Sequence, residues 1–168
     1  GWCLAGGSEL AFACDLVYIA EDAQVGYPAV RTMSSPDNQF YPWLMGMRAG
    51  MELMLTGDSI SGTEAVRLGF ANRAHPEAEL ESAVLAMAER IAKVDPELAQ
   101  LNKRLVHRQM EAMGLPAGLR AGTDLHALGW HTKASREYMA QMRQGVKEAL
   151  TSRDSTFGDY RTGDKSKA

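Results

Sequence analysis

The sequence has few cysteines, no block of like charges and no long apolar run. Cys3 and Cys14 both lie in the first fifteen residues and form no disulfide framework, so we expect reduced thiols in a cytoplasmic protein. The 18 Lys and Arg residues are interleaved with 21 Asp and Glu residues, and the resulting net charge of −3 makes nucleic acid a poor partner. No segment is long and apolar enough to cross a bilayer, and no cleavable leader is visible. The sequence therefore predicts neither membrane insertion nor export.

The chain does have enough apolar sequence for a buried core. Of its 168 residues, 45% are apolar, which suits one domain of ordinary size. The chain opens on Gly1-Trp2-Cys3 without an initiator methionine. Such a start is typical of the interior of a longer sequence.

The first 75 residues mix short strands with short helices. The pattern predicts helices over 8–14 and 40–55, strands over 16–20, 24–27 and 70–75, and a serine-rich loop over 31–38. Ser61 and Glu64 have the spacing of a capping box, in which each side chain accepts the backbone N–H of the other residue. That box predicts a helix from Ser61 to about Arg67.

Beyond Pro76 the pattern is helical. Helices are predicted over 79–94, 96–113, 116–128 and 134–152, so 76–153 is expected to form a helical subdomain. The stretch 154–168 has few apolar residues and is predicted to be a tail that covers a surface or is disordered. The chain thus divides into a mixed α/β part over 1–75, a helical subdomain and a tail.

Gly6 and Gly7 stand directly before the first predicted helix. Glycine adopts backbone conformations that other residues avoid, and it lets a ligand atom approach the main chain closely. A helix amino-terminus presents unpaired N–H groups and the positive end of the helix dipole, and both attract negative charge. On a thioester substrate, that charge would be an enolate oxygen formed during the reaction. A plain helix start is the simpler interpretation of the same turn.

Several motifs resemble one known family. The first is Gly1-Trp2-Cys3-Leu4-Ala5-Gly6-Gly7-Ser8-Glu9-Leu10-Ala11-Phe12-Ala13-Cys14-Asp15, which is similar to the crotonase stretch that supplies half of the oxyanion hole. The others are Ala23-Gln24-Val25-Gly26-Tyr27-Pro28, Leu55-Thr56-Gly57-Asp58-Ser59-Ile60, Glu64-Ala65 and Gly69-Phe70-Ala71-Asn72. Motifs in order are far more specific than any one of them. The chain therefore resembles the crotonase superfamily, the enoyl-CoA hydratase/isomerase group, strongly over 1–110 and weakly beyond.

This resemblance implies an α/β fold, namely the carboxyl-terminal part of a crotonase-like ββα spiral followed by a helical oligomerisation region. It implies an acyl-CoA thioester as substrate, coenzyme A only as part of that substrate, and a homotrimer or homohexamer. Gly6 would donate one backbone N–H to the thioester oxygen, and the family's amino-terminal half would supply the second donor. Glu9 would be the catalytic acid or base. The positions expected to contact substrate are Ala5, Gly7, Tyr27, Pro28 and Ala29.

One position departs from the family pattern. Hydratases of the family carry a second glutamate after the proline of the later strand, and this sequence has Ala29 there. Water addition needs one group to deprotonate the water and another to protonate carbon, so a single carboxylate suits it poorly. We therefore expect weak hydratase activity, with Glu9 moving a proton next to the thioester carbonyl. The alternative is a Glu9 that only complements the helix dipole.

Asp37 is a second candidate catalytic carboxylate. It lies 22 positions after Asp15, near the point where chlorobenzoyl-CoA dehalogenases of the superfamily place a nucleophilic aspartate. The run Pro36-Asp37-Asn38 is also a natural turn and helix cap. An acyl-CoA hydrolase or dehalogenase-like enzyme using Asp37 is therefore an alternative, and a non-catalytic crotonase-fold subunit is another.

The remaining conspicuous residues favour structural roles. The histidines His75, His107, His126 and His131 lack metal-ligand spacing, so no metal site is predicted. An acyl pocket could use Tyr27, Trp43, Met33, Met45, Met47, Met51 and Met54, although such residues are more often core. Arg31 could contact a carboxylate or phosphate, but a solvated surface side chain is the expectation.

Overall fold

Two small sheets lie at the centre of the computed structural model, which describes residues 1–38 and 40–159. The strands of the first sheet stand in the order β1 (Trp2–Leu4), β3 (Gln24–Gly26) and β4 (Ser59–Ser61). β1 and β3 are parallel, with Cys3 opposite Val25, while β3 and β4 are antiparallel. The second sheet pairs β2 (Tyr18–Ala20) with β5 (Arg73–His75) in parallel. The strands predicted over 16–20, 24–27 and 70–75 are thus present in shorter form.

Short helices cover these sheets and enclose an aromatic core. They are α1 (Gly6–Phe12), the 3-10 helix η1 (Pro28–Arg31), α2 (Phe40–Met45), α3 (Met47–Thr56) and α4 (Gly62–Leu68). The ring of Phe12 meets the rings of Tyr41 and Phe70 edge-on, at centroid distances of 4.2 and 4.4 Å. Such edge contacts add to the stabilisation that burial provides. Because Phe12 is the last residue of α1, this packing fixes the helix that begins at the glycine turn.

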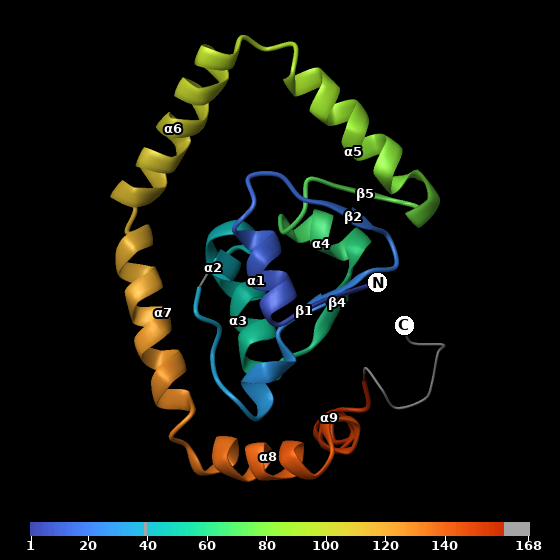
Figure 1. The fold of residues 1–168 in the computed structure, drawn as a ribbon, viewed down its shortest axis with the longest axis vertical. Helices are drawn as coiled ribbons and strands as arrows, with labels where there is room; N and C mark the ends of the chain where they lie inside the picture. Colours follow the sequence, from blue (N-terminus) through green and yellow to red (C-terminus); the bar gives the residue numbers. More distant parts are fainter. Residues whose placement is uncertain (39, 160–168) are drawn as a thin grey trace.

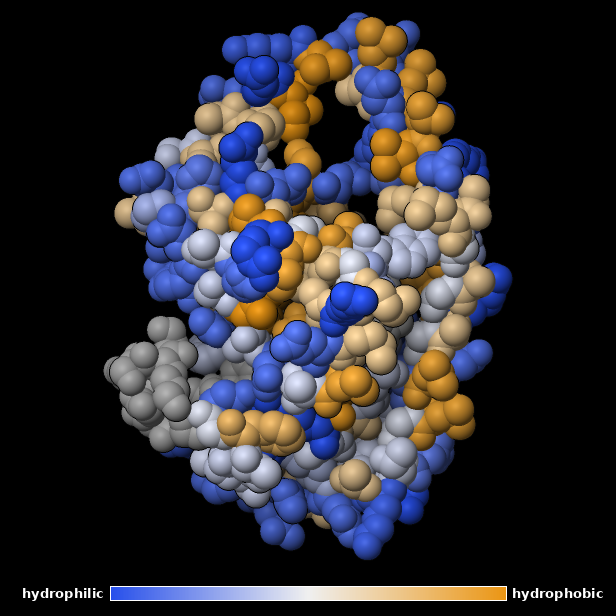
Figure 2. Space-filling view, turned by 180° about the vertical axis from the view of Figure 1, so that it is seen from behind, coloured by the Kyte–Doolittle hydropathy of each residue, from blue (hydrophilic) through white to orange (hydrophobic). Residues whose placement is uncertain are grey.

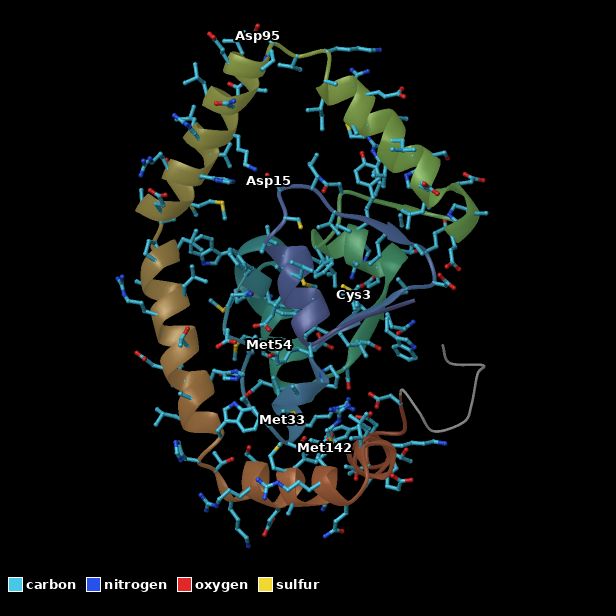
Figure 3. All side chains as sticks on the ribbon, in the orientation of Figure 1. Cys3, Asp15, Met33, Met54, Asp95 and Met142 are labelled. Carbon is cyan, nitrogen blue, oxygen red and sulfur yellow. The ribbon has the colours of Figure 1, made fainter. Side chains whose placement is uncertain are left out.

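Within the described stretch beyond residue 76, five further helices run around the core as an arch (Figure 1). In chain order they are α5 (Glu77–Ile91), α6 (Pro96–Ala112), α7 (Leu115–Gly129), α8 (Lys133–Gln144) and α9 (Val146–Ser155). Neither α5 nor α6 contains a buried residue. Asp95, labelled in Figure 3 at the junction of these two helices, caps α6 by accepting hydrogen bonds from the N–H groups of Glu97 and Leu98.

Glycines break two helices that the apolar pattern predicts as continuous. The helix predicted over 40–55 is divided into α2 and α3 at Gly46, where φ is 78° and ψ is 159°. The helix predicted over 134–152 is divided into α8 and α9 at Gly145, whose backbone is extended. Apolar residues keep their helical spacing across both breaks, so periodicity does not reveal them. At Gly46 the backbone has a conformation that other residues disfavour, which explains the glycine there.

The predicted capping box is only half formed. Ser61 Oγ accepts a hydrogen bond from the Glu64 N–H at 3.1 Å, as expected at a helix start. The Glu64 carboxylate pairs with the Arg67 guanidinium and does not return to the Ser61 N–H. A charged donor competes well with a neutral amide for a carboxylate. The prediction of the helix start is confirmed, and the prediction of the reciprocal bond is wrong.

Arg31 is buried, so the expectation of a solvated side chain is wrong. Its side chain is 1% exposed, and its guanidinium pairs with the carboxylates of Asp58, Asp154 and Asp159. The guanidinium also lies 3.8 Å from the centre of the Phe157 ring. A buried charge is tolerated where it is paired in this way. Arg31 therefore joins the end of the arch to the core.

Asp15 joins α6 to the core. Its carboxylate accepts hydrogen bonds from Lys103 Nζ at 2.5 Å and His107 Nε2 at 2.7 Å, and Figure 3 shows it on the loop that faces α6. The bonds from Lys103 and His107 hold the pKa of Asp15 below its ordinary value. Lys103 and His107 lie one turn apart on α6, so a single carboxylate reaches both.

The carboxyl-terminal end of the arch extends past the predicted start of the tail. α9 continues through Ser155, and Asp154 is buried against Arg31. The rest of the predicted tail from 160 to 168 lies outside the described residues. Within the described part of the chain, no helix is both long and apolar enough to span a membrane.

Candidate active site

The turn before α1 has its special backbone conformation at Ala5. Its φ of 50° and ψ of −122° make Ala5 the only non-glycine residue with positive φ among the described residues. Its N–H donates to the Gly26 carbonyl at 2.9 Å, and its own carbonyl accepts the N–H groups of Ser8 and Glu9. A side chain in such a conformation costs about 1–3 kcal/mol. The sequence predicts this unusual backbone conformation at Gly6 and Gly7, but the structure has it at Ala5.

Gly6 and Gly7 form the first helical turn of α1. Their N–H groups have no acceptor within the helix, as in any helix start. A Cβ atom added to either residue would meet nothing within 4 Å, so the outer side of the turn is open. Gly7 lines a groove of about 490 Å³ that α1 and β2 form with α5, and Ala5 lines a second hollow of about 320 Å³. Ligand atoms can therefore approach the turn.

A buried pair of hydroxyls supports the turn from behind. Tyr41 donates its hydroxyl hydrogen to Ser8 Oγ at 2.7 Å, and both side chains are fully buried. Ser8 Oγ in turn lies 2.7 Å from the Ala5 carbonyl oxygen and donates to it. Burial raises the pKa of Tyr41, which keeps this phenol a donor. Ala5, the residue with the strained backbone, is thus fixed by hydrogen bonds from the buried core.

Glu9 is held at both oxygens of its half-buried carboxylate. Oε1 accepts the N–H of Asp37 at 2.7 Å and the N–H of Asn38 at 3.3 Å. Oε2 lies 3.5 Å from the Tyr27 hydroxyl, which donates to it. Burial and, to a lesser degree, the charge of Glu9 raise the pKa of Tyr27, so the phenol remains protonated. The structure therefore brings together Glu9, Tyr27 and Asp37 from separate segments.

Asp37 donates its backbone N–H to Glu9, while its carboxylate lies on the side of His126. The carboxylate is 54% exposed, and its Oδ1 lies 3.8 Å from Nδ1 of His126 on α7. Sequence reasoning assigned no functional role to His126. The signal that could have found it is the spacing of Gly122, His126 and Gly129, which places them on one face of α7.

Pro28 and Ala29 are buried at the start of η1. The side chain of Ala29 is a methyl group, and its carbonyl accepts the N–H of Met33 at 2.8 Å. Pro28 shares the 320 Å³ hollow with Ala5. Of the candidate pocket residues, Tyr27 and Met45 are buried core, whereas Met47 and Met51 are exposed.

The described residues contain no cluster of three His, Cys, Asp or Glu side chains that could hold a metal ion. His107 and His126 bond to carboxylate or carbonyl oxygens and to neighbouring side chains. Such contacts are typical of histidines with structural roles.

Comparisons with known proteins agree on one family. The enoyl-CoA hydratase/isomerase family model matches residues 1–159. The Mycobacterium tuberculosis protein named "Putative enoyl-CoA hydratase EchA13" is 37% identical over 131 residues, which are 76% of this chain and 41% of that protein. The mitochondrial enoyl-CoA hydratase of Pongo abelii is 30% identical over 142 residues, which are 83% of this chain and 49% of that protein.

Solved structures give the same result. A crystal structure of enoyl-CoA hydratase from Mycobacterium smegmatis matches with a TM-score of 0.92 at 29% identity, covering 95% of this chain and 56% of that one. The chain spans about half the length of the relatives that it matches.

Proposed function

The chain belongs to the enoyl-CoA hydratase/isomerase family, and from this premise we propose that it forms part of an enzyme that acts on acyl-CoA thioesters. The motifs over 1–15, 23–28 and 55–72 predict this family and a crotonase-like α/β fold, and the comparisons confirm both. The proposed chemistry is proton transfer at carbon near the thioester carbonyl, with the enolate oxygen stabilised by backbone N–H groups. Coenzyme A enters as part of the substrate, and we propose no separate cofactor.

The Gly6 N–H is the proposed donor to the thioester oxygen. It lies in a turn whose outer side is open, and the strained backbone of Ala5 sets its direction. A second donor completes an oxyanion hole, and in this proposal it comes from outside residues 1–159. One donor fixed in advance commonly contributes about 3–4 kcal/mol to transition-state stabilisation. Gly7 and Ala5 would lie beside the substrate because each lines a hollow next to this turn.

The arrangement around Glu9 carries the proposal. One carboxylate oxygen is occupied by two backbone N–H groups, so proton transfer falls to Oε2, which faces Tyr27. A carboxylate fixed by donors is a base whose position does not depend on the substrate. In the proposed cycle, Glu9 takes a proton from the carbon next to the thioester carbonyl and returns it to the same carbon or to one further along the acyl chain. That cycle needs one carboxylate.

Ala29 makes hydration inefficient in the proposed mechanism. Water addition needs a second proton-transfer group opposite Glu9, and a methyl group cannot act as one. The carboxylate that lies near Glu9 is that of Asp37, which interacts with His126 and solvent. We therefore propose an isomerase-like proton transfer as the main reaction, with hydration much slower.

A homotrimer or homohexamer is the proposed assembly. Figure 2 shows apolar side chains along the inner rim of the upper arch and an opening between the arch and the core. The exposed apolar side chains of this part are Val84, Leu85, Ile91, Val94, Leu98, Leu101, Leu105 and Val106. α5 carries four glutamates and one arginine, a net charge of −3, whereas α6 carries Lys103, Arg104 and Arg108 against two glutamates, a net charge of +1, so α5 of one copy complements α6 of the next. Light scattering at micromolar concentration should give a trimer or hexamer, and a monomer alone would contradict the proposal.

The second candidate function uses Asp37 as a nucleophile, in a hydrolase or dehalogenase-like reaction. Its support is the His126 ring at 3.8 Å from the Asp37 carboxylate. A non-catalytic subunit of crotonase fold is the third candidate. Glu9→Gln separates the three, because it abolishes a Glu9-dependent reaction, spares an Asp37-dependent one and changes nothing in an inactive subunit.

The direct test follows deuterium from solvent into acyl-CoA thioesters incubated with the full-length protein that carries this chain. Glu9→Gln should slow incorporation next to the thioester carbonyl by about 10² to 10⁴, the usual loss for one positioned proton-transfer group. Glu21→Gln is the matched control, because Glu21 is an exposed glutamate. Incorporation that survives Glu9→Gln unchanged would overturn the proposed role of Glu9.

A further inference from the structure

We infer that α7 acts as a brace for Glu9, with Gly122 and His126 as positioning residues. The inference rests on the proposed function, because Glu9 must be the proton-transfer group for its position to matter. Two separate contacts between α7 and the loop over 34–38 carry the argument. Neither residue needs to touch the substrate.

Gly122 provides the first contact. It is buried in α7, and a Cβ atom built on it would overlap the carbonyl oxygen of Asp37. One turn earlier on the same helix, a Cβ atom at Gly118 would meet nothing within 4 Å. Gly129 repeats the close approach, since its Cβ would come 2.9 Å from Ser34 Cβ. α7 therefore lies directly against both ends of the loop over 34–38. At position 122, only glycine permits such a close approach.

His126 provides the second contact, and its hydrogen bonds define its tautomer. The Trp130 indole N–H can only donate, and it lies 2.9 Å from His126 Nε2, so Nε2 is the unprotonated acceptor. Nδ1 therefore carries the proton and donates it to the Ser35 carbonyl at 2.8 Å. The ring thus connects α7 to the loop one residue before Pro36, and Trp130 holds the ring in that orientation.

The same geometry excludes a Ser-His-Asp catalytic triad. Ser34 Oγ lies 3.1 Å from His126 Nδ1, and Asp37 Oδ1 lies 3.8 Å from the same nitrogen. A triad needs the serine and the aspartate on opposite nitrogens of the ring. Since Trp130 occupies Nε2, His126 has no nitrogen left for a nucleophile. A positioning role is the remaining interpretation.

The loop transmits this positioning to Glu9. The N–H groups of Asp37 and Asn38 both bond Glu9 Oε1, and the carbonyl of Asp37 is the group against which Gly122 packs. Moving that peptide away from α7 moves its own Asn38 N–H directly and shifts the adjoining Asp37 N–H, and these are the donors that orient the carboxylate. A displacement of about 1 Å at a catalytic group can cost about 10² in rate.

The first test compares Gly122→Ala with Gly118→Ala. Both add one methyl group to α7, but only Gly122→Ala pushes against the Asp37 carbonyl. In the full-length protein, we expect Gly122→Ala to lower kcat for the Glu9-dependent reaction by about 10- to 100-fold with KM little changed. Gly118→Ala should leave both values at the parent level. Equal kcat values for the two variants would overturn the brace.

The second test uses His126→Ala, His126→Asn and the control His131→Ala. The asparagine side-chain amide can replace Nδ1 as the donor to the Ser35 carbonyl, so it should restore most of the kcat that alanine loses. His131 is exposed and its side chain lies outside this network, so His131→Ala should behave like the parent. Alanine and asparagine variants with the same kcat would contradict the assigned hydrogen bond.

A readout independent of activity separates this inference from the proposed function. Amide hydrogen exchange at Asp37 and Asn38 should quicken by about tenfold or more in His126→Ala and Gly122→Ala, and should stay slow in His126→Asn and Gly118→Ala. That pattern in a protein without acyl-CoA activity would support the brace and reject the function. Unchanged exchange at both amides would reject the brace, whatever the activity.

Discussion

Tyr41 and Ser8 form a hydrogen bond of 2.7 Å between two side chains that are both fully buried. The Ser8 hydroxyl in turn donates a hydrogen bond to the carbonyl of Ala5, the residue with the strained backbone. The position of the glycine turn therefore depends on a polar contact inside the core. Residues that never reach a ligand help to set the direction of the Gly6 N–H.

Ser8→Ala is predicted to cost more stability than Tyr41→Phe. Ser8→Ala leaves the buried Tyr41 hydroxyl without its acceptor, which costs about 1–3 kcal/mol. Tyr41→Phe removes the hydroxyl itself, while Ser8 keeps the Ala5 carbonyl as a partner, so the loss should be about 1 kcal/mol. Urea unfolding followed by circular dichroism measures both. Equal losses would show that the pair is less enclosed than described.

Ala5→Gly should stabilise the protein. Glycine relieves about 1–3 kcal/mol of backbone strain at φ 50° and ψ −122°, against a cost of about 0.5–1 kcal/mol for the greater freedom of the unfolded chain. The expected net gain is about 1 kcal/mol, seen as a higher melting temperature. Ala11→Gly, one residue before the end of α1, serves as the control and should lower stability. A lower melting temperature for Ala5→Gly would contradict the strain.

Arg31→Lys should destabilise the protein strongly. The guanidinium bonds Asp58, Asp154 and Asp159 at once, and a lysine cannot reproduce that planar set of donors. Removing one charge of a buried pair typically costs about 3–5 kcal/mol. Lysine keeps the charge and loses only hydrogen bonds, so we expect a cost of about 1–3 kcal/mol. Arg48→Lys is the control, since Arg48 is exposed. Proteolysis should cut first near α9 in Arg31→Lys, and an unchanged cleavage pattern would refute the anchoring role.

Asp15→Asn should remove an acid-sensitive anchor of α6. The pKa of Asp15 is lowered in the folded protein by Lys103 and His107, so its stabilisation is present above the unfolded pKa of about 4 and is lost as pH falls through the lower folded value. Because the side chain is 46% exposed, the loss at about pH 7 should not exceed about 1 kcal/mol. Urea unfolding should show a smaller difference between parent and variant at about pH 2 than at about pH 7. A constant difference across that range would contradict the anchor.

Sequence reasoning predicted the parts of this molecule that depend on local chemistry. The start of α4 at Ser61 and the α/β fold follow from motifs or caps that lie within a few residues, while the roles of Gly6 and Glu9 stay predictions. The helix breaks at Gly46 and Gly145 were missed because the apolar spacing continues through both. Local pattern gives the type of an element more reliably than its ends.

Contacts between distant segments could not be predicted in the same way. Arg31 and Asp154 are 123 positions apart, and Ser34 and His126 are 92 positions apart. No periodicity connects such pairs, so the sequence predicts a surface position for Arg31 and a plain helical one for His126. The hydrogen bonds from Asp37 and Asn38 to Glu9 also join segments that are distant in sequence, and these segments meet only in the folded core.

The turnover number for hydration of crotonyl-CoA, compared between Ala29→Glu and the unmodified full-length protein, tests the single-carboxylate account most directly. Ala29 is 8% exposed, so circular dichroism must first show that the variant with its new buried carboxylate is folded. The account predicts very slow hydration by the unmodified protein and an increase of about 10² or more in Ala29→Glu, since the second proton-transfer group is restored. Brisk hydration by the unmodified protein, with no gain from Ala29→Glu, would contradict it.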